Sequence, residues 1–265
     1  MKLGYEAQAE SGLAQLGLLT AQQQLDTVAQ QAAAGQWSYR HFLGYLLAGE
    51  LQARHRRTVE TSLQFAHFPY LKYLADFDYR VQPSLDQRLI EDLAGGRFLS
   101  EGRNVVLLGP PGVGKTHLAI ALGVAVIEMG HRVYFTTAIE MARRLTKAMA
   151  DNRLHREFQN LVRPKLLIID EVGYLTLDAA QASLVFQAIA HRYEKQQPII
   201  LTSNKAFSEW GQVFAGDVVM ASAALDRLLH RCTVINIRGE SYRLKEKRQA
   251  AQTALALTPG EVAPA

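Results

Sequence analysis

The segment from Gly109 to Thr116 reads Gly-Pro-Pro-Gly-Val-Gly-Lys-Thr, and it constrains the fold more than any other stretch of this chain. Glycines at this spacing let the backbone turn tightly and direct several N–H groups inward, where they can hold the phosphates of a nucleotide. In such a loop Lys115 reaches the outer phosphates and the Thr116 hydroxyl binds Mg²⁺. The segment therefore predicts a site for ATP or GTP with Mg²⁺. The nucleotide-contacting residues expected from it are Gly109, Pro110, Pro111, Gly112, Val113, Gly114, Lys115, Thr116 and His117.

The neighbours of this loop match what a phosphate-binding loop requires. Residues 104–108 are apolar and read as a buried strand, and residues 117–127 read as a mostly apolar helix. The N-terminus of that helix would add its dipole to the anion site. A glycine turn that matched the motif by accident would not have both neighbours.

A second motif follows at residues 165–171, where an apolar run ends in Asp170 and Glu171. This pattern is typical of a parallel strand that is covered on both faces and carries functional groups at its carboxyl end. Asp170 is expected to hold Mg²⁺, and Glu171 to polarise a water that attacks the γ-phosphate. The alternative is an acidic pair that only caps a loop.

Composition limits the class of protein. The chain has 265 residues, 48% of them hydrophobic, which is enough for about two domains with real cores. A single cysteine, Cys232, excludes an internal disulfide. No apolar run reaches the length of a membrane span, and the first thirty residues do not resemble a signal peptide. We expect a soluble cytoplasmic protein with no membrane partner.

Periodicity predicts an α/β fold in three parts: a small all-helical N-terminal domain (1–75), a nucleotide-binding domain (76–248) and a flexible tail (249–265). Strands are expected near 104–108, 132–136, 166–170, 198–202 and 233–237, which implies a five-stranded, mainly parallel sheet flanked by helices. Helices are expected at 13–34 and from Tyr39 to about Ala66. A further helix should begin after Pro83, with Ser84 and Gln87 as a capping box, and end at Gly95.

Positive charge is concentrated between residues 132 and 165, where eight basic residues face three acidic ones. Such a surface can bind a phosphate backbone, although a charged run is usually only a solvated helix face. A second basic cluster consists of Arg54, Arg56 and Arg57. It could contact nucleic acid or a partner protein, or it could simply be an exposed helix face.

Polar residues downstream can complete the site. Asn204 follows the fourth predicted strand, so it should lie at the carboxyl edge of the sheet and could orient the attacking water. Arg227, Arg231 and Arg243 fall on two predicted helices, and an arginine placed against phosphate stabilises the charge of the transfer.

Together these residues resemble the AAA+ ATPases, within them the helicase-loader and initiator group, and more closely the IstB-type transposition helper ATPases of bacterial insertion sequences. The resemblance spans nearly the whole chain. It is carried by stretches in 42–54, 109–119 (Walker A), 169–174 (Walker B), 202–210 and 225–243. It implies an AAA+ core, Asn204 as sensor 1, Arg227 as a finger donated across a subunit interface, and Arg243 as sensor 2. It also implies that helices after the second strand face DNA, which favours DNA contact by Arg143, Arg144, Lys147, Arg153 and Arg156.

The resemblance implies an ATPase that oligomerises on double-stranded DNA with low sequence specificity, bends it and engages a transposase. A replicative helicase loader is one alternative, and a DNA scaffold that binds ATP without hydrolysing it is another. Arg231 lies one helical turn beyond Arg227 and could be the finger instead.

Overall fold

The computed structural model describes residues 4–174 and 176–242. The chain divides into two compact units, Met1–Thr61 and Ser62–Ala265. This division falls within the helix α3 (Tyr39–Phe65), earlier than the expected domain boundary at residue 75. The expected tail, 249–265, lies outside the described residues.

The first unit is a small helical assembly formed by α1 (Tyr5–Gln15), α2 (Leu19–Ala34) and most of α3. The single helix predicted for 13–34 is wrong, because the chain breaks between α1 and α2 at Gly17. This glycine has φ +65°, a left-handed conformation that ends a helix without a side-chain clash. The small core of this unit contains Ala21, Val28 and Leu46, with Leu13, Leu18, Leu25, Trp37 and Phe42 packed against it.

A buried carboxylate holds this unit together. Glu50 on α3 is 1% exposed, and its Oε2 accepts hydrogen bonds from the backbone N–H groups of Thr20 (2.7 Å) and Ala21 (3.0 Å) in the first turn of α2. Arg54 donates to Glu50 Oε1 at 3.0 Å, and Arg57 donates to Thr20 Oγ1 at 3.0 Å. Arg54 also donates to Gly17 O, between α1 and α2, at 2.9 Å, so two arginines of the basic cluster bind other parts of this unit.

The second unit is built on a five-stranded, entirely parallel sheet with the order β2-β3-β4-β1-β5. Each strand lies within two residues of its predicted range, which confirms the predicted sheet. The strands are β1 (Asn104–Leu108), β2 (Val133–Thr137), β3 (Leu166–Val172), β4 (Ile199–Ser203) and β5 (Cys232–Asn236). This order brings the carboxyl ends of β1, β3 and β4 together, which is where open α/β sheets bind ligands.

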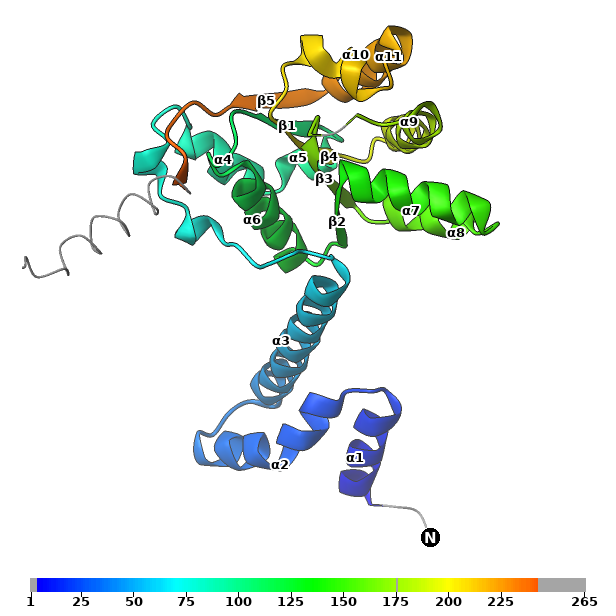
Figure 1. The fold of residues 1–265 in the computed structure, drawn as a ribbon. Coiled ribbons are helices and arrows are strands. Elements are labelled where there is room, and N and C mark those ends of the chain that lie inside the picture. Colours follow the sequence, from blue (N-terminus) through cyan, green and yellow to red (C-terminus); the bar gives the residue numbers. More distant parts are fainter. Residues whose placement is uncertain (1–3, 175, 243–265) are drawn as a thin grey trace, which may run out of the picture. The chain divides into compact units, whose positions relative to one another are not determined.

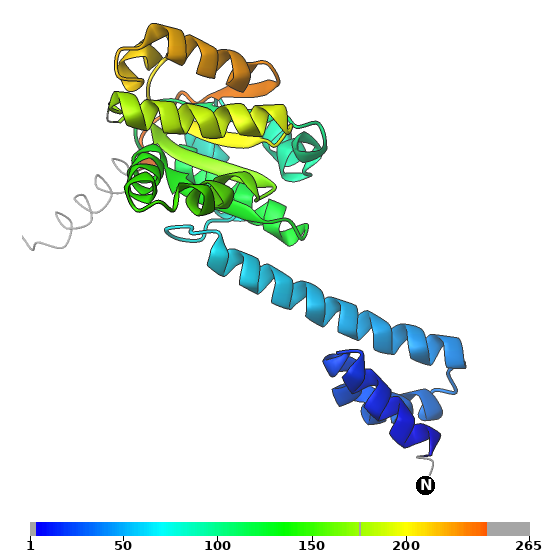
Figure 2. The same ribbon diagram turned by 90° about the vertical axis from the view of Figure 1, so that its right-hand side faces the viewer.

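Helices cover both faces of this sheet (Figure 1). The long helix α6 lies on one face, while α7, α8, α9 and α11 lie on the other, with α9 and α11 side by side in Figure 2. The helices are α4 (Gln87–Ala94), α5 (Arg97–Ser100), α6 (Lys115–Glu128), α7 (Ala138–Ala150), α8 (Leu154–Val162), α9 (Ala179–Glu194), α10 (Trp210–Val213) and α11 (Val218–Leu229), with short 3₁₀ turns η1 (Leu74–Asp76), η2 (Tyr79–Val81) and η3 (Phe207–Glu209).

The segment 66–82, which we call the strap, packs on α6 from the side away from the sheet. The backbone N–H of Phe135 donates to Ala66 O at 2.8 Å. A Cβ added at Gly123 would lie 2.8 Å from Ile168 Cδ1 on β3 and 2.9 Å from Phe68 Cζ on the strap. Glycine at this position of α6 therefore lets the helix fit between β3 and the strap.

The start of α4 differs from its prediction. Asp86, not Ser84, caps this helix by accepting from the backbone N–H of Arg88. Ser84 Oγ instead accepts from the backbone N–H of Arg238 at 2.8 Å. This bond to a residue far away in the sequence replaces the predicted capping bond. The helix ends at Gly95, as expected. Within the described part of the chain, no helix combines the length and apolar character needed to cross a bilayer.

Candidate functional site

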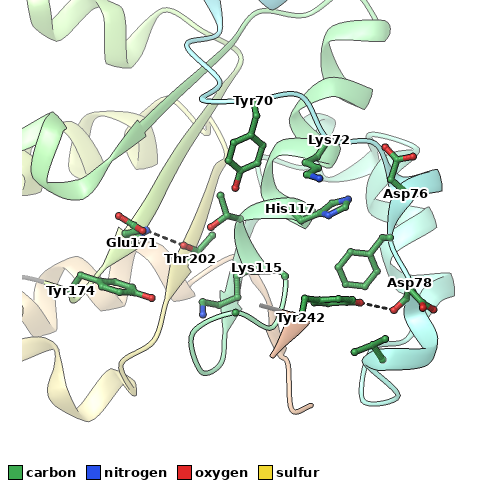
Figure 3. Close-up of a pocket in the computed structure, with 15 residues that line it drawn as sticks. Tyr70, Lys72, Asp76, Asp78, Lys115, His117, Glu171, Tyr174, Thr202 and Tyr242 are labelled. Atoms are coloured by element: carbon green, nitrogen blue, oxygen red, sulfur yellow. Dashed lines mark hydrogen bonds between the residues drawn. The ribbon is translucent and has the colours of Figure 1, made fainter. Parts of the chain in front are cut away.

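A hollow of 580 Å³ opens at the carboxyl ends of β1, β3 and β4 (Figure 3). Three parts of the chain that are far apart in the sequence surround it: the glycine loop with the start of α6, the ends of β3 and β4, and the strap with the last described residues. The predicted residues Gly112, Gly114, Lys115, Thr116, His117 and Glu171 line it, together with Thr202, Tyr174, Tyr242 and strap residues including Tyr70, Lys72 and Phe77.

The glycine loop has the backbone that phosphate binding requires. Gly112 and Gly114 have φ +84° and +95°, conformations that a side chain would strain. Lys115 is 7% exposed, and its Nζ donates to the carbonyl oxygens of Gly109 (2.7 Å) and Pro110 (2.8 Å). The ammonium group is therefore held beside the loop. Of the other predicted loop residues, Val113 is buried, and Pro110 and Pro111 are exposed.

Oxygen ligands converge at one end of the hollow. Thr116 Oγ1 lies 3.0 Å from both carboxylate oxygens of Asp170, which is 3% exposed at the end of β3. Thr202 Oγ1 donates to Asp170 Oδ1 at 2.5 Å. A hydroxyl next to a carboxylate is an all-oxygen donor set of the kind that Mg²⁺ prefers, so these residues fit that cation.

Glu171 lines the same hollow although it directly follows Asp170. Its φ is +60°, and the pairing of β3 with β4 is irregular between Ile169 and Val172. The backbone N–H of Glu171 donates to Thr202 Oγ1 at 3.0 Å. Sequence reasoning missed Thr202, although a polar residue near the end of the apolar run 199–203 was a signal for it.

Aromatic side chains form the opposite wall. Phe77 makes edge-to-face contacts with His117 and Tyr242, at centroid distances of 5.2 and 5.7 Å. Tyr242 also donates from its backbone N–H to Gly112 O at 3.0 Å and from its hydroxyl to Asp78 O. Burial raises the pKa of Tyr242 to about 12, so its hydroxyl stays a donor at neutral pH. Of these residues, only His117 was expected from the glycine-loop motif.

Burial also lowers the pKa of His117, which keeps its ring neutral near pH 7. The Nε2 of this ring lies 3.0 Å from Tyr73 O on the strap. His117 therefore links the start of α6 to the strap.

The remaining predicted residues lie elsewhere. Asn204 follows β4 but is not among the residues that line the hollow, and its Oδ1 is buried without a hydrogen-bond partner within the described chain. Arg227 lies in the last turn of α11, outside this hollow, where it donates to Ala223 O at 2.9 Å and stacks 5.0 Å from the Phe186 ring. Arg231 lines a separate small hollow with it. Arg243 lies outside the described residues.

A second hollow, of 500 Å³, lies between α7 and α8 and is lined by all five residues predicted to contact DNA. Three of them form ion pairs within the chain: Arg143 with Glu140 (2.7 Å), Arg144 with Glu157 (2.7 Å) and Arg153 with Asp151 (2.5 Å). Within residues 4–174 and 176–242, Lys147 and Arg156 form no ion pair. A count of charges along the chain cannot show this difference among the five.

Known proteins resemble this chain in sequence, and others resemble it in fold. The family described as IstB-like ATP binding protein matches residues 11–250. A protein of insertion sequence IS21 from Pseudomonas aeruginosa, named as ATP-binding, is 48% identical over 89% of this chain and 88% of its own length. An equivalent protein of IS5376 from Geobacillus stearothermophilus is 45% identical over 83% of this chain and 87% of its own length.

Two solved structures share the fold of the nucleotide-binding part of this chain. DnaI has a TM-score of 0.54 at 20% identity and covers 63% of this chain and 91% of its own. The DnaC helicase loader has a TM-score of 0.50 at 22% identity, covering 57% of this chain and 87% of its own. At these identities the likeness concerns the fold alone. With the phosphate-binding loop, the paired carboxylates and the match over 11–250, the chain belongs to the family of IstB-like ATP-binding proteins.

Proposed function

We propose that this protein is a Mg²⁺-dependent ATPase that assembles on duplex DNA as a homo-oligomer and engages a transposase. The observation that carries the proposal is a hollow lined by Lys115, Thr116 and Glu171 in a family member, with Asp170 bonded to the Thr116 hydroxyl. A second hollow with five basic residues lies on the helices that follow β2. One chain thus has candidate surfaces for the nucleotide and for DNA.

The residues of the first hollow divide the work of hydrolysis. The glycine loop and Lys115 bind the triphosphate, and Thr116 and Asp170 supply the oxygen ligands for the metal. When bound, Mg²⁺ neutralises charge on the phosphate oxygens. Glu171 accepts a hydrogen bond from the attacking water and aligns it with the γ-phosphate. Asn204 would assist this water only if its side chain reached the hollow in the nucleotide complex.

The hollow between α7 and α8 supports backbone contact with DNA. Cations without a carboxylate partner have no internal competitor for a phosphate group, so Lys147 and Arg156 are the strongest candidates within the described chain. To bind DNA, the other three would have to replace a carboxylate partner with a phosphate group: Arg143, Arg144 and Arg153. Among the described elements none resembles a base-reading helix, and contacts to phosphate alone give low sequence specificity and steep salt dependence.

The position of Arg227 supports an oligomeric site. It lies outside the hollow of its own chain, which supports contact with the triphosphate of a neighbouring subunit. The relatives named for insertion sequences support a transposase as partner, since an element of this kind moves by transposition. A helicase partner is the alternative outcome of a binding test.

Fluorescence anisotropy of a labelled duplex tests the proposal, with the wild-type chain and the variants Lys115→Ala and Glu171→Gln. We expect tight binding and large assemblies by electron microscopy with a non-hydrolysable ATP analogue, and weak binding without it. Glu171→Gln should bind DNA with ATP but not turn ATP over. A wild-type chain that stays monomeric and binds duplex equally with and without nucleotide would contradict the proposal.

A further inference from the structure

Two consecutive residues of one strand belong to the site: Glu171 lines the hollow, and Asp170 is bonded to Thr116 of the lining. Successive side chains of a regular strand point to opposite faces of the sheet, so a regular β3 would direct only one of these carboxylates toward the ligand. The backbone solves this with φ +60° at Glu171 and a shift in the β3–β4 register between Ile169 and Val172. A left-handed conformation is unfavourable for a residue other than glycine, so neighbouring contacts must stabilise it.

A single hydroxyl supplies such contacts. Thr202 Oγ1 has one proton, which it donates to Asp170 Oδ1, and it accepts the backbone N–H of Glu171 at 3.0 Å (Figure 3 shows the second bond). The first bond fixes the carboxylate of Asp170, and the second fixes the turn that aims Glu171. Thr202 is 1% exposed, so water does not compete with either bond.

The backbone of Thr202 is itself well fixed. Thr202 lies on β4, between β3 and β1, and it pairs in register with Leu107 of β1. β1 leads directly into the glycine loop. The Thr202 hydroxyl therefore holds the acidic pair at a fixed position relative to β1, the strand that leads into the phosphate-binding loop.

We propose that Thr202 is the positioning residue that aims Glu171 at the attacking water. This inference rests on the proposed ATP hydrolysis. It predicts a larger effect on turnover than on nucleotide binding, because within the described residues the Thr202 hydroxyl bonds to Asp170 and to the Glu171 backbone and not to the glycine loop.

The adjacent residue provides a matched control. Ser203 is also buried on β4, and its Oγ donates to Val172 O on β3 at 2.7 Å, but it has no bond to Asp170 or Glu171 within the described residues. Loss of the Ser203 hydroxyl removes one bond between β3 and β4, and loss of the Thr202 hydroxyl removes two, both to the acidic pair. Only the loss of Thr202 should affect the aim of Glu171.

The experiment compares Thr202→Val, Thr202→Ser, Ser203→Ala and Glu171→Gln in steady-state ATP turnover and in hydrogen–deuterium exchange of peptides spanning 168–174. For Thr202→Val we expect kcat to fall about tenfold to a hundredfold, with KM for ATP changed less than about threefold. Exchange at the Glu171 amide should rise. Thr202→Ser, which keeps the hydroxyl, and Ser203→Ala should stay within about threefold of the wild type. Thr202→Ala gives the same test if the valine variant does not fold.

A hydroxyl-free variant at Thr202 with wild-type kcat, alongside an inactive Glu171→Gln, would overturn this inference and leave the proposed function intact. Equal losses in Thr202→Ser and Thr202→Val would also overturn it. Turnover in Glu171→Gln equal to a substantial wild-type rate would instead overturn the role in hydrolysis that the proposed function gives to Glu171.

Discussion

The hydroxyl of Thr116 lies 3.0 Å from each carboxylate oxygen of Asp170. This contact joins the glycine loop to the acidic end of β3, two motifs that are 54 residues apart in the sequence. The two motifs thus form one site, and the contact marks where a cation would sit between the loop and the strand.

Asp170→Asn should therefore uncouple nucleotide binding from Mg²⁺. Because the amide keeps the size of the carboxylate and removes its charge, we expect ATP affinity in Mg²⁺ to fall about tenfold to a hundredfold. Without Mg²⁺ the variant and the wild type should bind alike. Calorimetric titrations with Mg²⁺ and with EDTA measure both affinities, and an unchanged response to Mg²⁺ in the variant would remove Asp170 from the metal site.

The ion pairs of the α7–α8 hollow predict unequal roles for its five basic residues. The double variant Lys147→Gln, Arg156→Gln should weaken duplex binding and reduce the slope of log K against log salt by about 1.8, since each lost phosphate contact removes about 0.9. Arg143→Gln should change the slope less, because Glu140 already holds that guanidinium at 2.7 Å. Anisotropy titrations over a range of salt concentrations give these slopes.

Glu140 gives the reciprocal test. Its hydrogen bond with Arg143 lowers the pKa of the Glu140 carboxyl, so this group is charged at neutral pH and competes with DNA phosphates for Arg143. Glu140→Gln should tighten duplex binding. If it weakens binding while the fold is unchanged, the hollow does not face DNA in the way proposed.

Much of the fold could be predicted because its signals are local. The five strands are apolar runs bounded by polar or turn residues, and each was placed within two residues. The break at Gly17 was missed because the apolar periodicity continues across it. The cap of α4 could not be chosen from local sequence, because Ser84 and Asp86 both have suitable side chains and a bond to Arg238 decides between them.

The candidate site likewise has residues that local sequence predicts and residues that it does not. The glycine loop and Asp170 with Glu171 are contiguous motifs, so their spacing alone identified them. Thr202 and Tyr242 enter the site through tertiary contacts, including the bond from Tyr242 to Gly112, and no spacing along the chain indicates such contacts. A charge count likewise found the basic surface but could not show which of its residues have carboxylate partners.

Glu50 predicts a pH dependence for the first helical unit. Burial acts to raise the pKa of this carboxyl, but hydrogen bonds from the backbone of Ala21 and Thr20 and from Arg54 outweigh it and lower the pKa. A lowered pKa in the folded state means that the ionised carboxylate stabilises the unit above its unfolded pKa of about 4.3. That contribution is lost as pH falls through the folded pKa.

Glu50→Gln should therefore lower the thermal stability of this unit at pH 7 and flatten its response to acid. Glu60→Gln is the matched control, since Glu60 is exposed on the same helix. Unfolding followed by tryptophan fluorescence in a Trp210→Phe background reports on the unit, because Trp37 packs against its core and Trp210 is buried in the second unit. Equal behaviour of the two variants would mean that the buried carboxylate does not stabilise the helices.

Arg192 on α9 predicts a large loss of stability. It is fully buried and donates to four carbonyl oxygens, those of Leu161 (2.8 Å), Pro164 (3.1 Å), Lys165 (3.1 Å) and Pro198 (2.8 Å). These bonds tie the end of α8 to the starts of β3 and β4. Arg192→Met leaves the carbonyls without these donors, so we expect a loss of about 2–5 kcal/mol in the free energy of unfolding.

Urea denaturation measures this loss, with Arg163→Met as the control because Arg163 is exposed at the end of α8. The control should stay within about 0.5 kcal/mol of the wild type. A similarly small change for Arg192→Met would show that the four bonds contribute little net stability.

Arg227 predicts complementation between two inactive variants. Its guanidinium stacks on Phe186 of its own chain, outside the hollow that contains Lys115. A Lys115→Ala subunit keeps Arg227 but cannot bind ATP well, whereas an Arg227→Ala subunit keeps the loop but has no finger. If the finger acts across the interface, a mixture of the two should regain ATP turnover in the presence of DNA, because some sites combine an intact loop with an intact arginine. Turnover that stays at the level of the separate variants would exclude a trans role for Arg227, and recovery with Arg231→Ala in place of Arg227→Ala would assign the finger to Arg231.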